Sequence, residues 1–111
     1  MTADSTSKPE QLVELLHAWN GGRAYVVSYA SGHRTLHVDV YSTAHPGSHL
    51  RLVCTDTMWF SGPLSWEDCS LQVLHGVGIY GGESGCIVFD ARARLTIETT
   101  ILGVEEIREK P

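Results

Sequence analysis

The sequence lacks the features of membrane and secreted proteins. No apolar run approaches the ~20 residues that a helix needs to cross a bilayer. The first nine residues are polar, with Lys8 as their one cation, and contain none of the apolar stretch typical of a secretory signal. Cysteine is scarce, at three residues, and an odd number without a signal predicts reduced thiols in the cytoplasm. We therefore expect a cytoplasmic protein that does not associate with membranes.

Metal-binding cysteine pairs are also missing. Cys54, Cys69 and Cys86 are separated by wide intervals and form no CxxC element, which structural zinc sites use. We therefore predict no bound cofactor.

Positive charge is scarce as well. Eight Lys and Arg residues stand against 13 Asp and Glu, which gives a formal net charge of -5. The cations are spread along the chain instead of clustering, whereas a nucleic-acid-binding surface needs a basic patch to meet the phosphates. The composition therefore argues against nucleic acid as a partner and leaves another protein as the expected one.

The remaining composition is that of an ordinary globular domain. The chain has 111 residues, of which 42% are hydrophobic and 19% charged. A chain of this size buries roughly two-thirds of the surface that its unfolded form exposes, enough for a core without disulfides or metals. We predict a disordered tail over residues 1–7 and a single globular domain over residues 8–108.

One helix is predicted near the N-terminus. Ser7 and Glu10 have the spacing of a capping box, and Pro9 suits the first helical turn. An apolar stripe with helical spacing follows, made of Leu12, Leu15, Leu16 and Trp19. Asn20-Gly21 then supplies the residues that commonly end a helix.

The rest of the chain has the pattern of β-strands. Residues 23–41 predict a hairpin, since two β-branched or alternating segments flank a Ser-Gly turn. A strand around residues 49–54 follows, and residues 58–60 either extend it or form a separate short strand. Residues 65–68 predict one helical turn, and residues 70–102 predict a further strand pair. The expected fold is therefore α+β: an N-terminal helix followed by a six- or seven-stranded, mainly antiparallel meander, as a roll, an open barrel or a small sandwich.

A metal site can be assembled from two of the six histidines and one aspartate. His37 and Asp39 lie two residues apart, so strand alternation places both on one sheet face. With the distant His75 they would form the two-His, one-carboxylate set that leaves open positions on a non-heme iron. The competing interpretation is a solvated sheet face beside His37 and Asp39, with His75 in the core.

A glycine motif has a structural interpretation. Residues 76–81 match GxGxxG, but the following sequence, rich in glycine, is unsuited to the helix that a dinucleotide site needs. We interpret these glycines as part of a strand and turn.

Aromatic residues give a second candidate site. Trp59, Phe60 and Trp66 flank a Ser-Gly-Pro break, and tryptophan is enriched at interface hot spots. The alternative is that these rings fill the core, since large aromatic side chains dominate small cores.

Two functions remain open from the sequence. The first is a non-catalytic protein-interaction or accessory module. This hypothesis rests on the small size, the acidity and the Trp59–Trp66 segment. A homodimer is also open, formed through an unprotected edge strand of the sheet. The second is a metal-dependent or small-ligand enzyme that uses the sheet face of His37 and Asp39.

Overall fold

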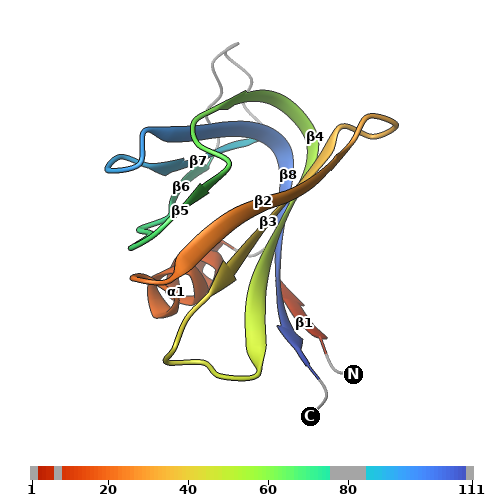
Figure 1. Ribbon diagram of the computed structural model, residues 1–111. Helices are drawn as coiled ribbons and strands as arrows, with labels where there is room; N and C mark the ends of the chain where they lie inside the picture. Colours follow the sequence, from red (N-terminus) through yellow and green to blue (C-terminus); the bar gives the residue numbers. More distant parts are fainter. Residues whose placement is uncertain (1–2, 7–8, 76–84, 110–111) are drawn as a thin grey trace.

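A computed structural model describes residues 3–6, 9–75 and 85–109, and shows a mostly β protein with one short helix (Figure 1). The elements in chain order are β1 (Ala3–Thr6), α1 (Pro9–Ala18), β2 (Arg23–Ala30), β3 (Thr35–Tyr41), β4 (Ser48–Ser61), β5 (Ser65–Trp66), β6 (Gln72–His75), β7 (Cys86–Asp90) and β8 (Leu95–Arg108). No helix in this described part has both the length and the apolar character needed to cross a membrane.

The strands form a half-barrel of two antiparallel meanders. The strand order is β5-β2-β3-β4-β8-β7-β6, so β2, β3 and β4 follow one another on one side and β6, β7 and β8 on the other. The long strands β4 and β8 pair with each other and join the two meanders into one sheet. β1 pairs with the end of β8, which places the two ends of the chain on the same side of the molecule (Figure 1).

Both long strands bend at the same point, where Asp56 of β4 meets Thr100 of β8. Asp56 has a φ of 57°, in the left-handed region that asparagine and aspartate tolerate better than most residues. The Thr100 hydroxyl lies 3.0 Å from the Oδ2 of Asp56 and fastens the two strands there. The register also shifts between Thr57 and Trp59, a β-bulge that increases the local bend.

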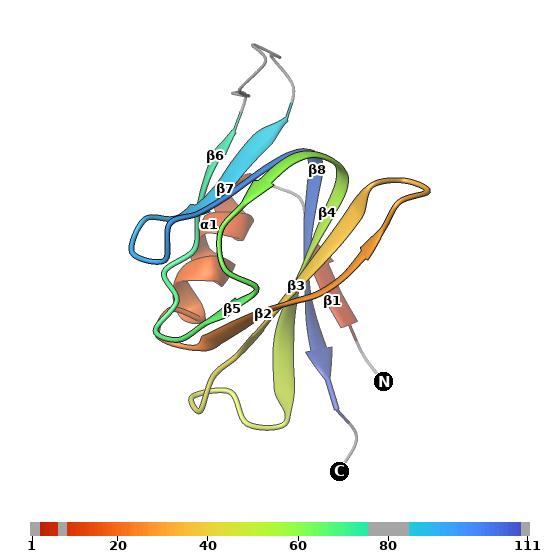
Figure 2. The same ribbon diagram turned by 45° about the horizontal axis from the view of Figure 1, so that its top comes forward.

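The concave face of the sheet holds the core. Alternating residues of each strand point inward, and α1 fills the hollow with three buried side chains, Leu12, Leu16 and Trp19 (Figure 2). The buried sheet residues are mainly Val, Leu and Ile, which suit a pleated surface, and they include Val38, Val40, Leu50, Leu52, Val88, Ile97 and Val104. The helix is therefore held by its apolar stripe against the sheet and not by its own length.

Several sequence predictions are confirmed. The helix occupies residues 9–18, and Gly21 ends it with a φ of 89°. The hairpin over residues 23–41 is present as β2 and β3, and residues 58–60 extend β4. Ser7, the expected capping residue, and the GxGxxG segment lie outside the described residues.

Other predictions need correction. The α+β label fits only loosely, because the described part has one short helix beside a large antiparallel sheet. The meander is interrupted, since β4 pairs with β8, which is distant in sequence. Residues 3–6, part of the expected tail, form β1 and pair with the end of β8 along the edge that β7 leaves free. The helical turn at residues 65–68 is wrong too: Ser65–Trp66 is β5, paired with β2.

Gly22 provides a test of how the helix meets the sheet. A Cβ at this position would collide with the carbonyl oxygen of Tyr41, whereas a Cβ on Gly32 would meet nothing within 4 Å. We expect Gly22→Ala to lower the free energy of unfolding by about 2–3 kcal/mol, because the end of α1 must move away from β3. Urea denaturation checks this, with Gly32→Ala as the matched control, which should change stability by less than about 0.5 kcal/mol. Equal changes in the free energy of unfolding for the two variants would show that the close approach of Gly22 to Tyr41 does not contribute to stability.

Candidate functional site

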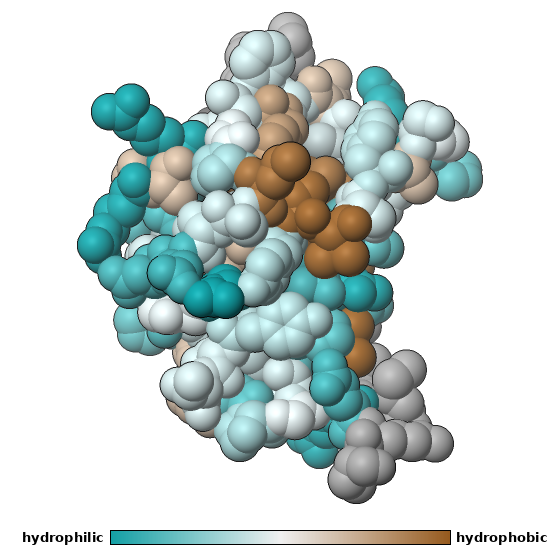
Figure 3. Space-filling view, viewed as in Figure 1, coloured by the Kyte–Doolittle hydropathy of each residue, from teal (hydrophilic) through white to brown (hydrophobic). Residues whose placement is uncertain are grey.

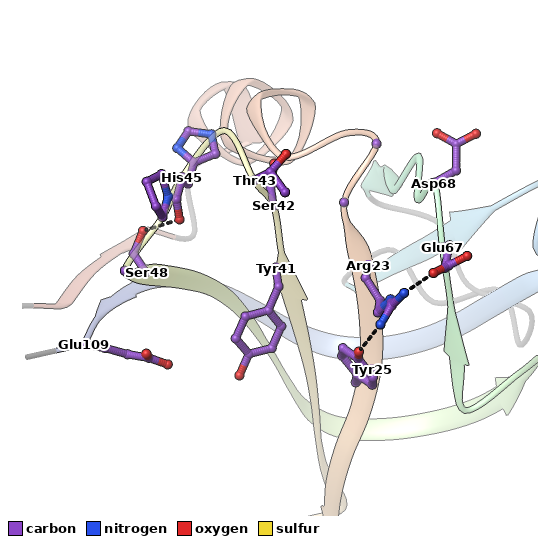
Figure 4. A pocket seen from close by; sticks show the side chains of 14 residues that line it. Arg23, Tyr25, Tyr41, Ser42, Thr43, His45, Ser48, Glu67, Asp68 and Glu109 are labelled. Atoms are coloured by element: carbon purple, nitrogen blue, oxygen red, sulfur yellow. Dashed lines mark hydrogen bonds and ion pairs between the residues drawn. The ribbon is translucent and has the colours of Figure 1, made fainter. Parts of the chain in front are cut away.

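An open groove of about 590 Å³ lies at one end of the sheet (Figure 4). The end of α1, the start of β2, the end of β3 and the 42–48 loop meet there. We call it the tyrosine groove, after its two aromatic residues, Tyr25 and Tyr41. Other side chains that line it include Arg23, His45, Glu67 and Glu109.

One wall of the tyrosine groove is made by two neighbouring strands. Arg23 and Tyr25 are alternate residues of β2, and Tyr41 lies directly opposite Arg23 on β3, so all three side chains share one face. The rings of Tyr25 and Tyr41 meet edge to face, with centroids 5.9 Å apart. Arg23 donates a hydrogen bond to the Tyr25 hydroxyl and forms an ion pair with Glu67. These contacts hold the wall in one arrangement.

The opposite wall is the loop between β3 and β4. His45 stacks on the buried Trp19 ring, with centroids 4.2 Å apart, and its Nε2 donates a hydrogen bond to the carbonyl oxygen of Ala18 at 3.1 Å. The backbone N–H of Glu109 donates to the carbonyl oxygen of Gly47 at 2.8 Å. The loop is thus attached to the helix on one side and to the end of the chain after β8 on the other.

A buried ion pair lies below the groove. Asp39 is 2% exposed and accepts hydrogen bonds from Nε and an Nη of Arg51 at 2.7 and 2.9 Å. Such a bidentate contact is strong and directional, and it raises the pKa of Arg51. His49 lies beside the pair, with its Nε2 3.4 Å from Oδ2 of Asp39. The Tyr41 ring stacks on the His49 ring, with centroids 4.9 Å apart. Tyr41 therefore rests on a rigid polar base.

Tyr41 and Arg23 in the tyrosine groove are held in their protonated forms. Burial, followed by the nearby carboxylates of Asp39 and Glu109, raises the pKa of Tyr41. The phenol therefore keeps its proton at neutral pH and acts as a hydrogen-bond donor or acceptor. Arg23 is held as a cation by Tyr25 and Glu67, both of which raise its pKa. Tyr41 and Arg23 can therefore bind and orient a ligand, but these two side chains do not act as bases near neutral pH.

The structure does not bring the three residues of the expected metal site together. Asp39 is occupied by Arg51, and His37 lies 3.3 Å from the Ser28 hydroxyl on the neighbouring strand. His75 is exposed on β6, and β4, β8 and β7 separate it from β3. Within residues 3–6, 9–75 and 85–109, no group of three His, Cys, Asp or Glu side chains could hold a metal ion.

The three aromatic residues proposed as a binding surface are separated as well. Trp66 is buried, and its Nε1 donates to Asp90 at 2.9 Å, so it closes the core between β5 and β7. Phe60 is half-buried and packs against the core. Trp59 alone of the three has a largely open side chain, 47% exposed.

The cysteines are core residues. All three are free and buried. Burial raises the pKa of Cys54 to about 12 and that of Cys86 to about 11. A thiolate is the reactive form of cysteine, so neither side chain is suited to nucleophilic chemistry near neutral pH.

Sequence reasoning identified the face of Asp39 but not its partner. Arg51 stands directly across from Asp39 in the β3–β4 register, and both occupy outward positions in their strands. The sequence predicts which residues of each strand share a face, but it does not predict the register that places Asp39 opposite Arg51. Comparison with protein-family models, curated proteins and solved structures found no match, so no relative supplies a function for the groove.

The Asp39–Arg51 pair can be tested by stability. Asp39→Ala leaves the Arg51 guanidinium partly buried without its carboxylate, and we expect a loss of about 3 kcal/mol in the free energy of unfolding. Arg92→Ala, which removes an ion pair whose two side chains are 75% and 65% exposed, should cost less than about 1 kcal/mol. Urea denaturation measures both, and similar losses would contradict a supporting role for the buried pair.

The buried thiols allow a second test. At pH 8 the folded protein should be alkylated by iodoacetamide at least about 100-fold more slowly than the protein in urea, because the reactive thiolate is disfavoured and shielded in the fold. Mass spectrometry over time counts the added groups. Rapid alkylation of Cys54 or Cys86 without denaturant would contradict this prediction and would favour a reactive cysteine.

Proposed function

We propose that the protein is a non-catalytic protein-interaction or accessory module that binds a segment of another protein in the tyrosine groove. The observation that carries this proposal is the state of Tyr41. Its ring is 41% exposed, yet it is fixed by stacking on His49 and by the edge contact with Tyr25. A rigid, exposed aromatic side chain loses little entropy on binding and is typical of interface hot spots.

The shape and chemistry of the groove also favour a protein segment. The groove is open along its length, whereas small-molecule sites usually enclose most of their ligand. Its walls combine two phenol rings with the charged side chains of Arg23, Glu67 and Glu109, a mixture that suits the polar rim and aromatic centre of an interface. The face that has β2 in front is mainly polar, with a small group of hydrophobic residues near its middle (Figure 3).

The alternative function, a metal-dependent or small-ligand enzyme on the face of His37 and Asp39, has less support. Asp39 would have to give up both hydrogen bonds from Arg51 to coordinate a metal, and this would leave the guanidinium without its partner. The histidines predicted to join it lie elsewhere: His37 against Ser28, and His75 on β6.

The distribution of charge supports a protein partner over nucleic acid. Four arginines pair with carboxylates of the chain, namely Arg23, Arg34, Arg51 and Arg92. Half of the eight Lys and Arg residues are thus paired within the chain, which reduces the positive charge free to meet a phosphate backbone. We keep the cytoplasm as the proposed location, since buried free thiols suit a reducing compartment.

A homodimer through the sheet edge is less favoured than a different partner. The edge strand β5 has two residues, and β2 beside it has a bulge after Val26. Short and bulged edges are the means by which sheets avoid extending into a neighbouring molecule. Size-exclusion chromatography with light scattering would measure the mass directly.

Tyr41→Ala tests the proposed function. We expect a protein partner captured from the native host by the wild-type chain to be lost with Tyr41→Ala, because the fixed aromatic contact is gone, with an affinity drop of roughly 30-fold or more. The matched control is Tyr29→Ala, which removes a 54% exposed tyrosine from β2 outside the groove. Quantitative mass spectrometry of the captured proteins compares the three. A partner retained by Tyr41→Ala, or lost equally with Tyr29→Ala, would refute the groove as the binding site.

A further inference from the structure

Glu98 is a buried carboxylate without a counter-charge. It lies on β8 beyond the bend, is 5% exposed, and its Oε2 has no hydrogen-bond partner. Among the residues that the structure describes, no arginine or histidine lies within ion-pair distance of it. Burying an unpaired carboxylate oxygen is costly, so folded proteins rarely keep one without a role.

The side chain of Glu98 is almost fully buried, and Trp59 is its neighbour on β4. Trp59 is directly opposite Glu98 in the β4–β8 register, so the two side chains share the outer face of the sheet. Ile87 of β7 flanks Glu98 on the other side. Met58, the extra residue of the β-bulge, is 45% exposed next to Trp59, which is 47% exposed. Bulges often re-aim side chains beside functional sites.

The two side chains suit one kind of ligand. Tryptophan is the best aromatic partner for a cation above its ring. A carboxylate oxygen without a partner can accept a charge-assisted hydrogen bond from a guanidinium. Arginine makes both contacts with a single planar group, which stacks on aromatic faces and is less strongly hydrated than an ammonium. The net charge of -5 would also favour the approach of a basic partner.

We propose that Trp59 and Glu98 form a binding site for an arginine side chain of a partner protein. Rotation of the exposed Trp59 ring uncovers Glu98, and the guanidinium then lies between the indole and the carboxylate. This site is separate from the tyrosine groove, which lies at the other end of β4, so it does not depend on the function proposed for that groove.

The test uses a defined probe, the peptide acetyl-Gly-Arg-Gly-amide. NMR spectra of the nitrogen-15-labelled protein follow the indole N–H signals during titration. We expect the Trp59 signal to shift and saturate, while those of Trp19 and Trp66, both buried, stay in place and serve as internal references. The same peptide with citrulline, which is neutral and nearly isosteric, should bind at least about tenfold more weakly, because it lacks the charge that strengthens both contacts.

Variants separate binding from a structural role. Glu98→Gln should weaken binding of the arginine peptide at least about tenfold, whereas Glu14→Gln, an equal charge change at an exposed position on α1, should leave it unaltered. Trp59→Leu, at a half-exposed position, should fold and also lose binding. Glu98→Gln should unfold at the same or a higher urea concentration than the wild type, as expected when a buried charge kept for binding is removed. Equal binding of the citrulline peptide, or full binding by Glu98→Gln, would overturn the proposal.

Discussion

The pairing of β4 with β8 is the constraint on which the rest of the structure depends. These two strands are separated in sequence by β5, β6 and β7, yet their register runs from Ser48 opposite Arg108 to Ser61 opposite Thr96. Each meander alone would leave its apolar face open to water, because the residues that cover it come from the other meander and from α1. Joined and bent, they enclose α1 and bury a single core.

The bend decides which surfaces can carry function. Asp56 and Thr100 fasten both strands at the corner, and the inward alternation of β8 changes phase there. Thr99 and Leu102 are both buried although three residues apart, while Ile101 between them is 57% exposed. One half of the β4–β8 ribbon therefore supports the Asp39–Arg51 pair and the tyrosine groove, and the other half supports Trp59 and Glu98. The two surfaces use the same strands but face different neighbours.

Local signals in the sequence were sufficient for the helix and the first hairpin. The stripe ending at Trp19 and the glycine at position 21 depend on residues close in sequence, as does the alternation of β3. The β4–β8 register could not be predicted, because many alignments of two alternating strands bury similar apolar area. Strand alternation alone would place Ile101 on the same face as Ile97, but the alternation of β8 changes phase at Thr100, where it contacts Asp56, and no local pattern reports that contact. Because strand register could not be predicted, Arg51 was not identified as the partner of Asp39. Trp59 and Trp66 were likewise grouped as one surface, although the fold buries Trp66 and exposes Trp59.

The contrast between two buried carboxylates clarifies how this sheet is used. Asp39 and Glu98 both lie on the outer face, and both are almost fully buried. Asp39 has a bidentate arginine across the strand, so its charge is compensated within the chain and it supports its neighbours. Glu98 has Trp59 and Ile87 as its cross-strand neighbours, and neither can neutralise it. If selection acted on stability alone, a neutral or apolar residue at position 98 would serve the sheet better, since an unpaired buried charge is among the costliest features a fold can contain. A charge kept at such a cost is best explained by a cation that arrives from outside the chain.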